Sequence, residues 1–171
     1  MIFTGNGKGK TTASLGQALR SAGDKRKTLM VQFIKGPWAS GEDTSHKKLA
    51  PYLKIIKTGK GFVGIGGDTL PRSVHRDAAK EGLALACAQA MTDRWDMLIL
   101  DEVWNALHLK LLTQKDVRTA IQTIKPHVEH LIMTGRDCPA SFIKMADLVT
   151  EMREIKHPFA VGIKGKKGLE Y

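Results

Sequence analysis

Cysteine is scarce in this sequence of 171 residues, with Cys87 and Cys138 as the two examples. They lie far apart and have no partner cysteine or histidine at ligand spacing, which excludes a disulfide framework and a cysteine-based zinc site. The sequence also lacks a run of roughly 18 apolar residues, the length that a membrane-spanning helix requires. Its first residues, MIFTGNGKGK, do not have the charged and then apolar pattern of a signal peptide. We therefore expect a cytoplasmic protein without a membrane segment.

Acidic residues are few in the first third of the sequence. Residues 1–60 contain 12 lysines and arginines against 3 acidic residues, whereas residues 61–171 contain 15 against 14. The net charge of +10 therefore comes almost entirely from the first third. Such a bias favours an anionic partner, for which a polyphosphate, an anionic small molecule and nucleic acid are all candidates. A solvated, lysine-rich surface explains the same charge equally well.

Short apolar segments alternate with longer segments of helical spacing. Strands are predicted over residues 1–4, 28–34, 53–57, 97–100, 130–134 and 148–155, and helices from a Gly-rich turn to about residue 22 and over residues 77–91, 113–124 and 140–146. This alternation is typical of the α/β class, with a mostly parallel sheet flanked by helices, and the length predicts one domain over residues 1–171. Two segments, 36–41 and 58–71, have no assignable regular structure, and loops of such length in a compact domain are usually functional or disordered.

The first strand is followed at once by GNGKGKTT at residues 5–12. A phosphate-binding loop has the pattern G-x-x-x-x-G-K-[ST] between a strand and a helix, although here the first glycine of the pattern falls on Thr4. The backbone N–H groups of such a loop bind phosphate together with the helix N-terminus, while the lysine reaches the phosphates and the hydroxyl binds Mg²⁺. The predicted nucleotide contacts of this loop are Gly5, Asn6, Gly7, Lys8, Gly9, Lys10, Thr11 and Thr12.

The apolar strand at residues 97–100 leads into Asp101 and Glu102. In phosphate-loop proteins an acidic residue at the end of a neighbouring strand holds Mg²⁺, directly or through water. We therefore predict a site for Mg²⁺ or Mn²⁺ formed by Thr11, Asp101 and Glu102, with Glu102 as a second metal contact or a general base. The structural alternatives are a glycine turn that caps a helix and an acid pair that caps a strand. The first does not explain the strand and helix on either side of the loop, and the second fits less well once the loop is accepted.

These motifs, together with several others, resemble the ATP:corrinoid adenosyltransferase family. The resemblance rests on TGNGKGKTT at residues 4–12, LDE at 100–102, TGRDC at 134–138, ADLVTE at 146–151, KHP at 156–158 and GIKGKKGLEY at 162–171. Gly61-Phe62, which follows Gly59, is similar to the family's G-x-G-F step. The similarity runs from residue 2 to the end in the same order, and no general ATPase has this set.

The resemblance implies transfer of the 5′-deoxyadenosyl group of ATP to the Co(I) of a corrinoid, with release of triphosphate, in the biosynthesis or salvage of cobalamin. The corrinoid would be cob(I)yrinic acid a,c-diamide or cob(I)alamin, and the protein would have a recombinase-like phosphate-loop fold. A homodimer and a flavoprotein reductase as electron donor are further implications. Because Co(I) is itself the nucleophile, the protein needs a phosphate cradle, a metal and a dry face beside C5′ rather than a base.

Carried onto the matching positions, the family's functional residues give specific expectations. Lys10, Thr11 and Glu102 are expected to be catalytic. Arg136 is expected to contact ATP, although a surface salt bridge suits it equally well. Phe62 is expected to contact the corrinoid and to cover the lower face of cobalt, because its ring has no lone pair to donate and Co(I) prefers no axial ligand.

A histidine ligand would stabilise the more oxidised metal and so oppose the reaction. We therefore assign five histidines to the surface or to packing: His46, His75, His108, His127 and His130. His157 belongs to the family-like Lys-His pair, as a ligand contact or as a residue that orders the C-terminal segment. Trp38 could cover a ring of a bound molecule, but the favoured prediction is that it packs its loop or an interface. Trp104 is predicted to pack the core or an interface.

The sequence departs from the family at three places, one of which is Gly165-Lys166 near the C-terminus, where Ala-Gln is common. Some members have Thr-Trp after Gly-Phe, whereas Val63-Gly64 follows here, which leaves Phe62 as the only ring in that loop. Longer members carry a segment before the first strand, and because this sequence begins at the strand, we expect no lid from such a segment.

Two other functions fit parts of the sequence. A phosphate-loop ATPase or kinase would use Glu102 to polarise water or an acceptor, and its product would be phosphate or diphosphate rather than triphosphate. A nucleic-acid-binding module of the recombinase-like type would use the basic first third. Base-stacking platforms need clustered aromatic residues, however, and these make up only 6% of the sequence.

Overall fold

The structure is a computed structural model that describes residues 1–36, 38–65 and 67–169. Within these ranges six strands form one sheet in the order β3-β2-β4-β5-β1-β6, and each neighbouring pair is parallel. The strands are β1 (Ile2–Thr4), β2 (Thr28–Gln32), β3 (Leu53–Lys57), β4 (Met97–Asp101), β5 (His130–Thr134) and β6 (Val149–Glu151). The helices are α1 (Lys10–Gly23), α2 (Glu42–Ser45), α3 (Arg72–Ala90), α4 (Val103–His108), α5 (Gln114–Ile124) and α6 (Ala140–Ile143), with 3₁₀ turns η1 (His46–Leu49), η2 (Lys125–His127) and η3 (Pro158–Val161).

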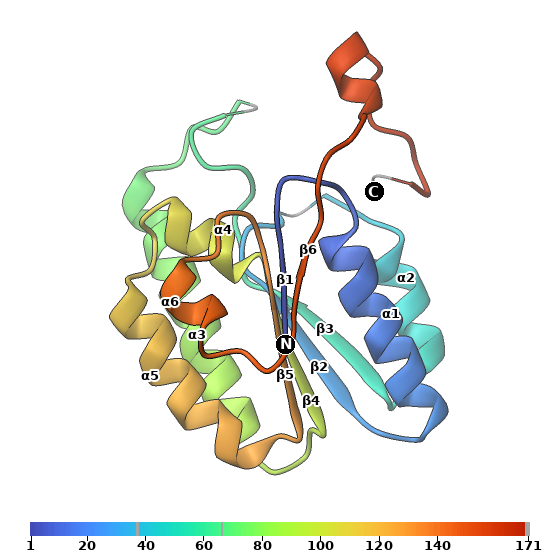
Figure 1. The fold of residues 1–171 in the computed structure, drawn as a ribbon, viewed down its shortest axis with the longest axis vertical. Coiled ribbons are helices and arrows are strands. Elements are labelled where there is room, and N and C mark those ends of the chain that lie inside the picture. Colours follow the sequence, from blue (N-terminus) through green and yellow to red (C-terminus); the bar gives the residue numbers. More distant parts are fainter. Residues whose placement is uncertain (37, 66, 170–171) are drawn as a thin grey trace.

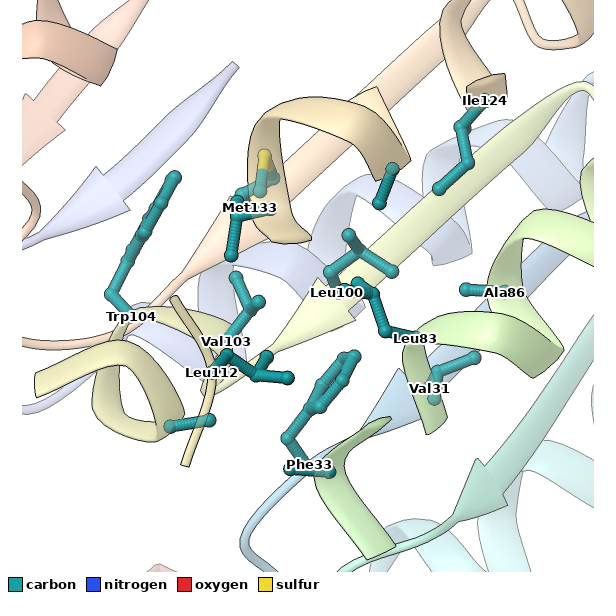
Figure 2. Packing of buried hydrophobic residues seen from close by; sticks show 14 of the residues in the cluster. Val31, Phe33, Leu83, Ala86, Leu100, Val103, Trp104, Leu112, Ile124 and Met133 are labelled. Carbon is teal, nitrogen blue, oxygen red and sulfur yellow. The ribbon is translucent and has the colours of Figure 1, made fainter. Parts of the chain in front are cut away.

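Helices cover both faces of the sheet, with α1 and α2 on one side and α3, α4, α5 and α6 on the other (Figure 1). Strand side chains alternate between the two layers, so that Leu98 and Leu100 of β4 join the larger apolar cluster and Met97 and Ile99 join the smaller one beneath α1. Figure 2 shows Leu100 among the labelled side chains of the larger cluster. Burial on both faces explains why the central strands are continuous apolar runs, and it confirms the α/β prediction.

The carboxyl ends of all six strands lie at the same edge of the sheet because the strands are parallel. In such sheets, ligands bind at the edge where the strands end and the loops begin. The loop from β1 to α1, the end of β4 and the loops after β2 and β3 all leave from this edge, which lies at the top of Figure 1. The predicted functional segments are therefore brought together by the topology.

Several element boundaries differ from those predicted. β6 covers Val149–Glu151 rather than residues 148–155, because beyond Glu151 the chain leaves the sheet and crosses the phosphate loop. There the N–H of Met152 donates to the carbonyl of Thr4 at 2.8 Å, and the carbonyl of Met152 accepts from the N–H of Gly7 at 2.7 Å. The predicted strand end was thus wrong, since residues that look extended in sequence are used to hold the loop instead.

The other differences are smaller. β2 ends at Gln32 rather than at residue 34, α3 begins at Arg72 rather than at residue 77, and α6 ends at Ile143 rather than at residue 146. Helix α5 has the predicted N-cap, because Thr113 and Asp116 form a capping box.

Two short helical elements, α2 and η1, follow the first unassigned segment and were not predicted. Pro37, Gly66 and the last two residues of the terminal motif, Glu170 and Tyr171, lie outside the described residues. Among the helices in the described ranges, none has the length and apolar content to cross a membrane.

Candidate active site

The phosphate loop turns sharply between β1 and α1, and glycine makes this turn possible. Gly5 and Gly9 have φ angles of 96° and 117°, in the left-handed region that side chains disfavour. A Cβ atom added to Gly5 would lie 2.4 Å from the carbonyl oxygen of Met152, so the loop is also pressed against the segment after β6. The predicted Gly-rich turn is therefore present, and its shape depends on a contact with a residue almost 150 positions away in the sequence.

Lys10 is the first residue of α1, and its side chain lies inside the phosphate loop. Its Nζ donates hydrogen bonds to the carbonyl oxygens of Gly5 and Gly7, both at 2.7 Å. Burial lowers the pKa of the ammonium group, the positive charge of Arg136 lowers it further, and the carboxylates of Glu102 and Asp101 act in the opposite direction. Gly9, the N-cap of α1, has no side chain to cap the first turn, so the backbone N–H groups there suit an anion.

Asp101 is fully buried at the end of β4 and accepts hydrogen bonds from three side chains. Its Oδ1 accepts from the hydroxyls of Thr11 at 2.9 Å and Thr134 at 2.7 Å, and its Oδ2 accepts from Nε2 of Gln32 at 3.1 Å. Burial raises the pKa of this carboxyl group, while the hydrogen bonds oppose that shift. The contact with Thr11 joins the phosphate loop to β4, as the sequence predicted.

Glu102 has a left-handed backbone with a φ of 64°. Its N–H donates to the Thr134 hydroxyl at 2.9 Å, and its Oε1 lies 3.5 Å from Nδ2 of Asn105. Burial, followed by repulsion from Asp101, raises the pKa of Glu102 to about 7, and the charges of Lys35, Lys10 and Arg136 oppose this rise. A cation placed beside such a carboxyl group stabilises its charged form.

The donor set at this edge suits a hard divalent cation. The Thr11 hydroxyl and the carboxylates of Asp101 and Glu102 are oxygen ligands of the kind that Mg²⁺ and Mn²⁺ prefer. Oε1 of Gln32 is buried without a hydrogen-bond partner beside Asp101, which leaves one acceptor for a water or ion at the site. In the described residues no three His, Cys, Asp or Glu side chains gather as a metal cage, so a cation here would need further ligands, such as phosphate oxygens.

Arg136 is brought to the same site by the turn after β5. Its N–H donates to Oδ1 of Asn105 at 2.7 Å, and its charge acts on both Lys10 and Glu102. Gly135, with a φ of 141°, allows this approach, since an added Cβ atom would lie 2.7 Å from Cβ of Trp104. The other predicted loop residues, Asn6, Lys8 and Thr12, are exposed on the surface of the loop.

Three residues of the site were not predicted individually: Gln32, Thr134 and Met152. Gln32 interrupts the apolar run TLMVQFI with a fully buried amide, and an amide at the end of a buried strand is a signal that could have been used. Thr134 lies in the TGR segment that carried the family resemblance. The role of Met152 has no sequence signal, because it depends on where β6 pairs.

Phe62 lies in the loop after β3 and is 54% exposed. It is the only ring in that loop among the described residues, but its neighbour is Trp38 from the loop after β2, with ring centroids 5.5 Å apart. Trp38 lies close over Gly36 and Gly61, where an added Cβ atom would lie 2.9 Å from its ring, which is consistent with the predicted loop-packing role, yet the side chain is 58% exposed. Trp104 is fully buried beside Phe142, which confirms its assignment to the core.

The five histidines assigned to the surface or to packing occupy such positions. His75 is buried and its Nε2 lies 3.0 Å from Oδ2 of Asp68, whose carboxylate also accepts N–H bonds from Gly64 and Leu70. The remaining four lie beside acidic side chains or backbone oxygens in these pairs: His46 with Glu42, His108 with Asp137, His127 with Asp93, and His130 with Glu129. Nδ1 of His157 accepts the N–H of Phe159 at 3.2 Å, which orders the start of η3.

Comparison with known proteins agrees with this geometry. The family model described as ATP:corrinoid adenosyltransferase BtuR/CobO/CobP matches residues 1–171. Corrinoid adenosyltransferases from Escherichia coli (strain K12) and Sinorhizobium sp. are 35% and 36% identical to the chain, over its whole length and over 84% and 79% of their own. Corrinoid adenosyltransferase CobA from Salmonella typhimurium is 32% identical over the whole chain and 84% of its own length.

Proposed function

The chain belongs to the ATP:corrinoid adenosyltransferase family, and we propose that the edge formed by the phosphate loop, β4 and the aromatic loops carries out that family's reaction. The reaction moves the 5′-deoxyadenosyl group of ATP to the cobalt of a reduced corrinoid. The observation that supports this assignment best is the contact between Thr11 of the phosphate loop and the buried Asp101, with Lys10 beside them. It joins a triphosphate cradle to an acidic residue in one site.

The reaction requires little covalent chemistry from the protein. Co(I) supplies an electron pair to C5′ of ATP, a Co–C bond forms, and the C5′–O bond breaks so that triphosphate leaves with its electron pair. The developing negative charge is on the leaving group, so catalysis depends on positive charge and N–H donors arranged in advance. In this proposal Lys10 releases the carbonyls of Gly5 and Gly7 and turns to the phosphates, joined by Lys8 and Arg136.

A divalent cation would be held by Thr11, Asp101 and Glu102. When bound, Mg²⁺ or Mn²⁺ supplies Lewis-acid neutralisation of the triphosphate charge. Asp101 fixes the orientation of the Thr11 hydroxyl through their 2.9 Å hydrogen bond, and Thr134 and Gln32 hold Asp101 in place. Glu102, with a pKa of about 7, takes its charged form most readily when positive charge enters the site.

Phe62 is the residue that we place against the corrinoid. A phenyl ring has no lone pair, so it can exclude water and other axial ligands from cobalt without binding the metal. Loss of axial ligands makes Co(II) easier to reduce to Co(I), the nucleophile in the transfer. The exposed position of Phe62 in the loop after β3 supports this role.

The finer features of the activity follow from the family resemblance. We place the protein in cobalamin biosynthesis or salvage, with cob(I)yrinic acid a,c-diamide or cob(I)alamin as the acceptor. A homodimer in the cytoplasm, supplied with electrons by a flavoprotein reductase, completes the proposal. The comparisons favour adenosyl transfer to a corrinoid over the two other functions considered from the sequence, a phosphate-loop ATPase or kinase and a nucleic-acid-binding NTPase.

The direct test is to incubate the protein with ATP, Mg²⁺ and a chemically reduced Co(I) corrinoid. A light-sensitive Co–C bond, seen in the absorption spectrum, together with one triphosphate for each bond formed, is the expected result. Phosphate or diphosphate without a Co–C bond would instead identify an ATPase or kinase. Lys10→Ala serves as the impaired control, and Lys115→Ala, which removes an exposed lysine on α5, as the matched control that should behave like wild type.

A further inference from the structure

Trp38 and Phe62 come from different loops and form one exposed aromatic surface. Their ring centroids lie 5.5 Å apart with the ring planes inclined by 32°, which is the range of a favourable aromatic pair. The two residues are nevertheless 58% and 54% exposed. Adjacent large rings that remain more than half exposed are typical of a surface that binds another molecule.

The backbone beneath the rings is closely packed. An added Cβ atom on Gly36 would lie 2.8 Å from Cα of Gly61, so the two loops touch where neither has a side chain. Gly61 has a φ of 111°, and its own Cβ would lie 2.9 Å from the Trp38 ring. The indole therefore covers the point where the loops meet.

The loop that carries Trp38 is also anchored from the neighbouring strand. Nζ of Lys57, the last residue of β3, donates to the carbonyl oxygen of Trp38 at 3.0 Å and to Oδ2 of Asp43 at 2.5 Å. On the Phe62 side, the N–H of Gly61 donates to the carbonyl of Ile34 at 3.2 Å. Both rings are thus attached to the ends of β2 and β3.

The aromatic surface lies next to the nucleotide end of the site. The N–H of Phe33, directly after β2, donates to the carbonyl of Asp101 at 3.0 Å. Lys35, three residues before Trp38, lies close enough for its charge to act on Glu102. A flat molecule resting on the two rings would therefore lie beside the triphosphate site.

We propose that Trp38 is a second corrinoid-contacting residue, which forms one face with Phe62 and holds the Phe62 ring in position. This inference rests on the proposed function, because the occupant is the corrin macrocycle. A corrin ring is broad, flat and apolar on its face, which suits a two-ring surface better than it suits one phenyl group. Trp38 thus supplies from another loop the second ring that the Val63-Gly64 sequence does not provide.

The test measures binding of cob(II)alamin to the ATP-loaded protein by equilibrium dialysis, with the absorption spectrum of the bound Co(II) recorded in parallel. Trp38→Ala should raise the Kd for cob(II)alamin about tenfold, as expected for one lost aromatic contact, and leave the Kd for ATP unchanged. Trp38→Phe, which keeps a ring, should recover most of the affinity. Met91→Ala, an equally exposed apolar residue at the end of α3, is the matched control.

A double-mutant cycle tests whether the rings act as a unit. The product of the fold-increases in Kd for the single variants Trp38→Ala and Phe62→Ala should exceed the fold-increase for the double variant. Each single substitution already disrupts the shared face, so the second one costs less. Unchanged cob(II)alamin binding in Trp38→Ala, a raised Kd for ATP, or independent effects in the cycle would overturn the inference. Formation of the Co–C bond by the wild type tests the proposed function separately, so failure of one is distinguishable from failure of the other.

Discussion

The phosphate loop and the aromatic loops share one edge of the sheet, yet they are held in different ways. At the phosphate end, polar groups are buried and paired: Asp101 accepts three side-chain hydrogen bonds, and the Lys10 ammonium donates to two carbonyls. At the aromatic end, Trp38 and Phe62 are more than half exposed, and their order comes from close backbone contacts. One end is arranged for charge and the other for surface contact.

The difference follows from what each end is proposed to bind. Charge on a leaving triphosphate is stabilised best by dipoles and cations whose orientation is already fixed, and burial increases their effect. A flat macrocycle instead requires an open apolar surface, and each contact contributes modestly. Loss of the Lys10 charge at the phosphate end should therefore weaken binding and activity more than loss of one ring at the aromatic end.

The largest effect is expected from Lys10→Ala. Removal of the ammonium group should weaken ATP binding and slow turnover by roughly 10- to 150-fold, because a lost charged contact is worth about 1.5–3 kcal/mol. Isothermal titration with ATP and single-turnover assays would measure both. An ATP affinity and rate equal to those of wild type would contradict the assignment of the phosphate loop.

Phe62→His introduces a ligand where the proposal requires none. Imidazole bound to Co(II) must be lost before reduction, and if that loss costs about 1.4 kcal/mol, adenosylation from Co(II) with a mild reductant should slow about tenfold. From chemically reduced Co(I) the rate should change much less, because Co(I) takes no axial ligand.

Phe62→Leu is the matched control for this test, since it removes the ring without adding a lone pair. It should slow the reaction from both starting states to a similar, smaller extent. An equal loss in Phe62→His from Co(II) and from Co(I) would mean that Phe62 only shapes the pocket.

Glu102→Gln should lower activity about fivefold with the fold intact, because a neutral amide holds the cation less strongly than a carboxylate does, a loss of about 1 kcal/mol. The Mg²⁺ concentration for half-maximal activity should rise at the same time. Glu81→Gln, on the exposed face of α3, should change neither value. If the Mg²⁺ concentration for half-maximal activity does not change, Glu102 is not a metal contact, and Asp101 is the residue to test next.

The last expected effect is on the stability of the free protein, a quantity separate from activity. The pKa of Glu102 is raised from 4.5 to about 7 on folding, so between these values the folded state binds more protons than the unfolded state. Its contribution to the free energy of unfolding therefore falls as the pH rises from 4.5 to 7. Glu102→Gln should gain stability relative to wild type over this range, by about 1–3 kcal/mol, as followed by urea denaturation. A difference between the two proteins that stays constant with pH would contradict the raised pKa.

Much of the molecule was determined by local sequence. Alternating apolar strands and helices predicted the parallel α/β sheet, because strands buried on both faces must be apolar throughout. The GKT step and the acid after an apolar strand predicted Thr11 beside Asp101, and the 2.9 Å hydrogen bond confirms that contact. These features can be predicted from the sequence because a strand, a turn and a helix N-terminus each require particular residue types within a few positions.

What only the tertiary structure decided depends on contacts between distant segments. Met152 contacts the phosphate loop because β6 pairs with β1, and the residues near position 152 do not indicate which strand β6 pairs with. The raised pKa of Glu102 comes mainly from its burial in the packed chain, with repulsion from Asp101 adding to it, whereas the charges of Lys35, Lys10 and Arg136 from other segments oppose the rise. Trp38 meets Phe62 only because two glycines let their loops touch. Strand pairing, burial and close approach are properties of the packed chain. The local sequence therefore indicated the chemistry of the site but not the positions of all the residues that form it.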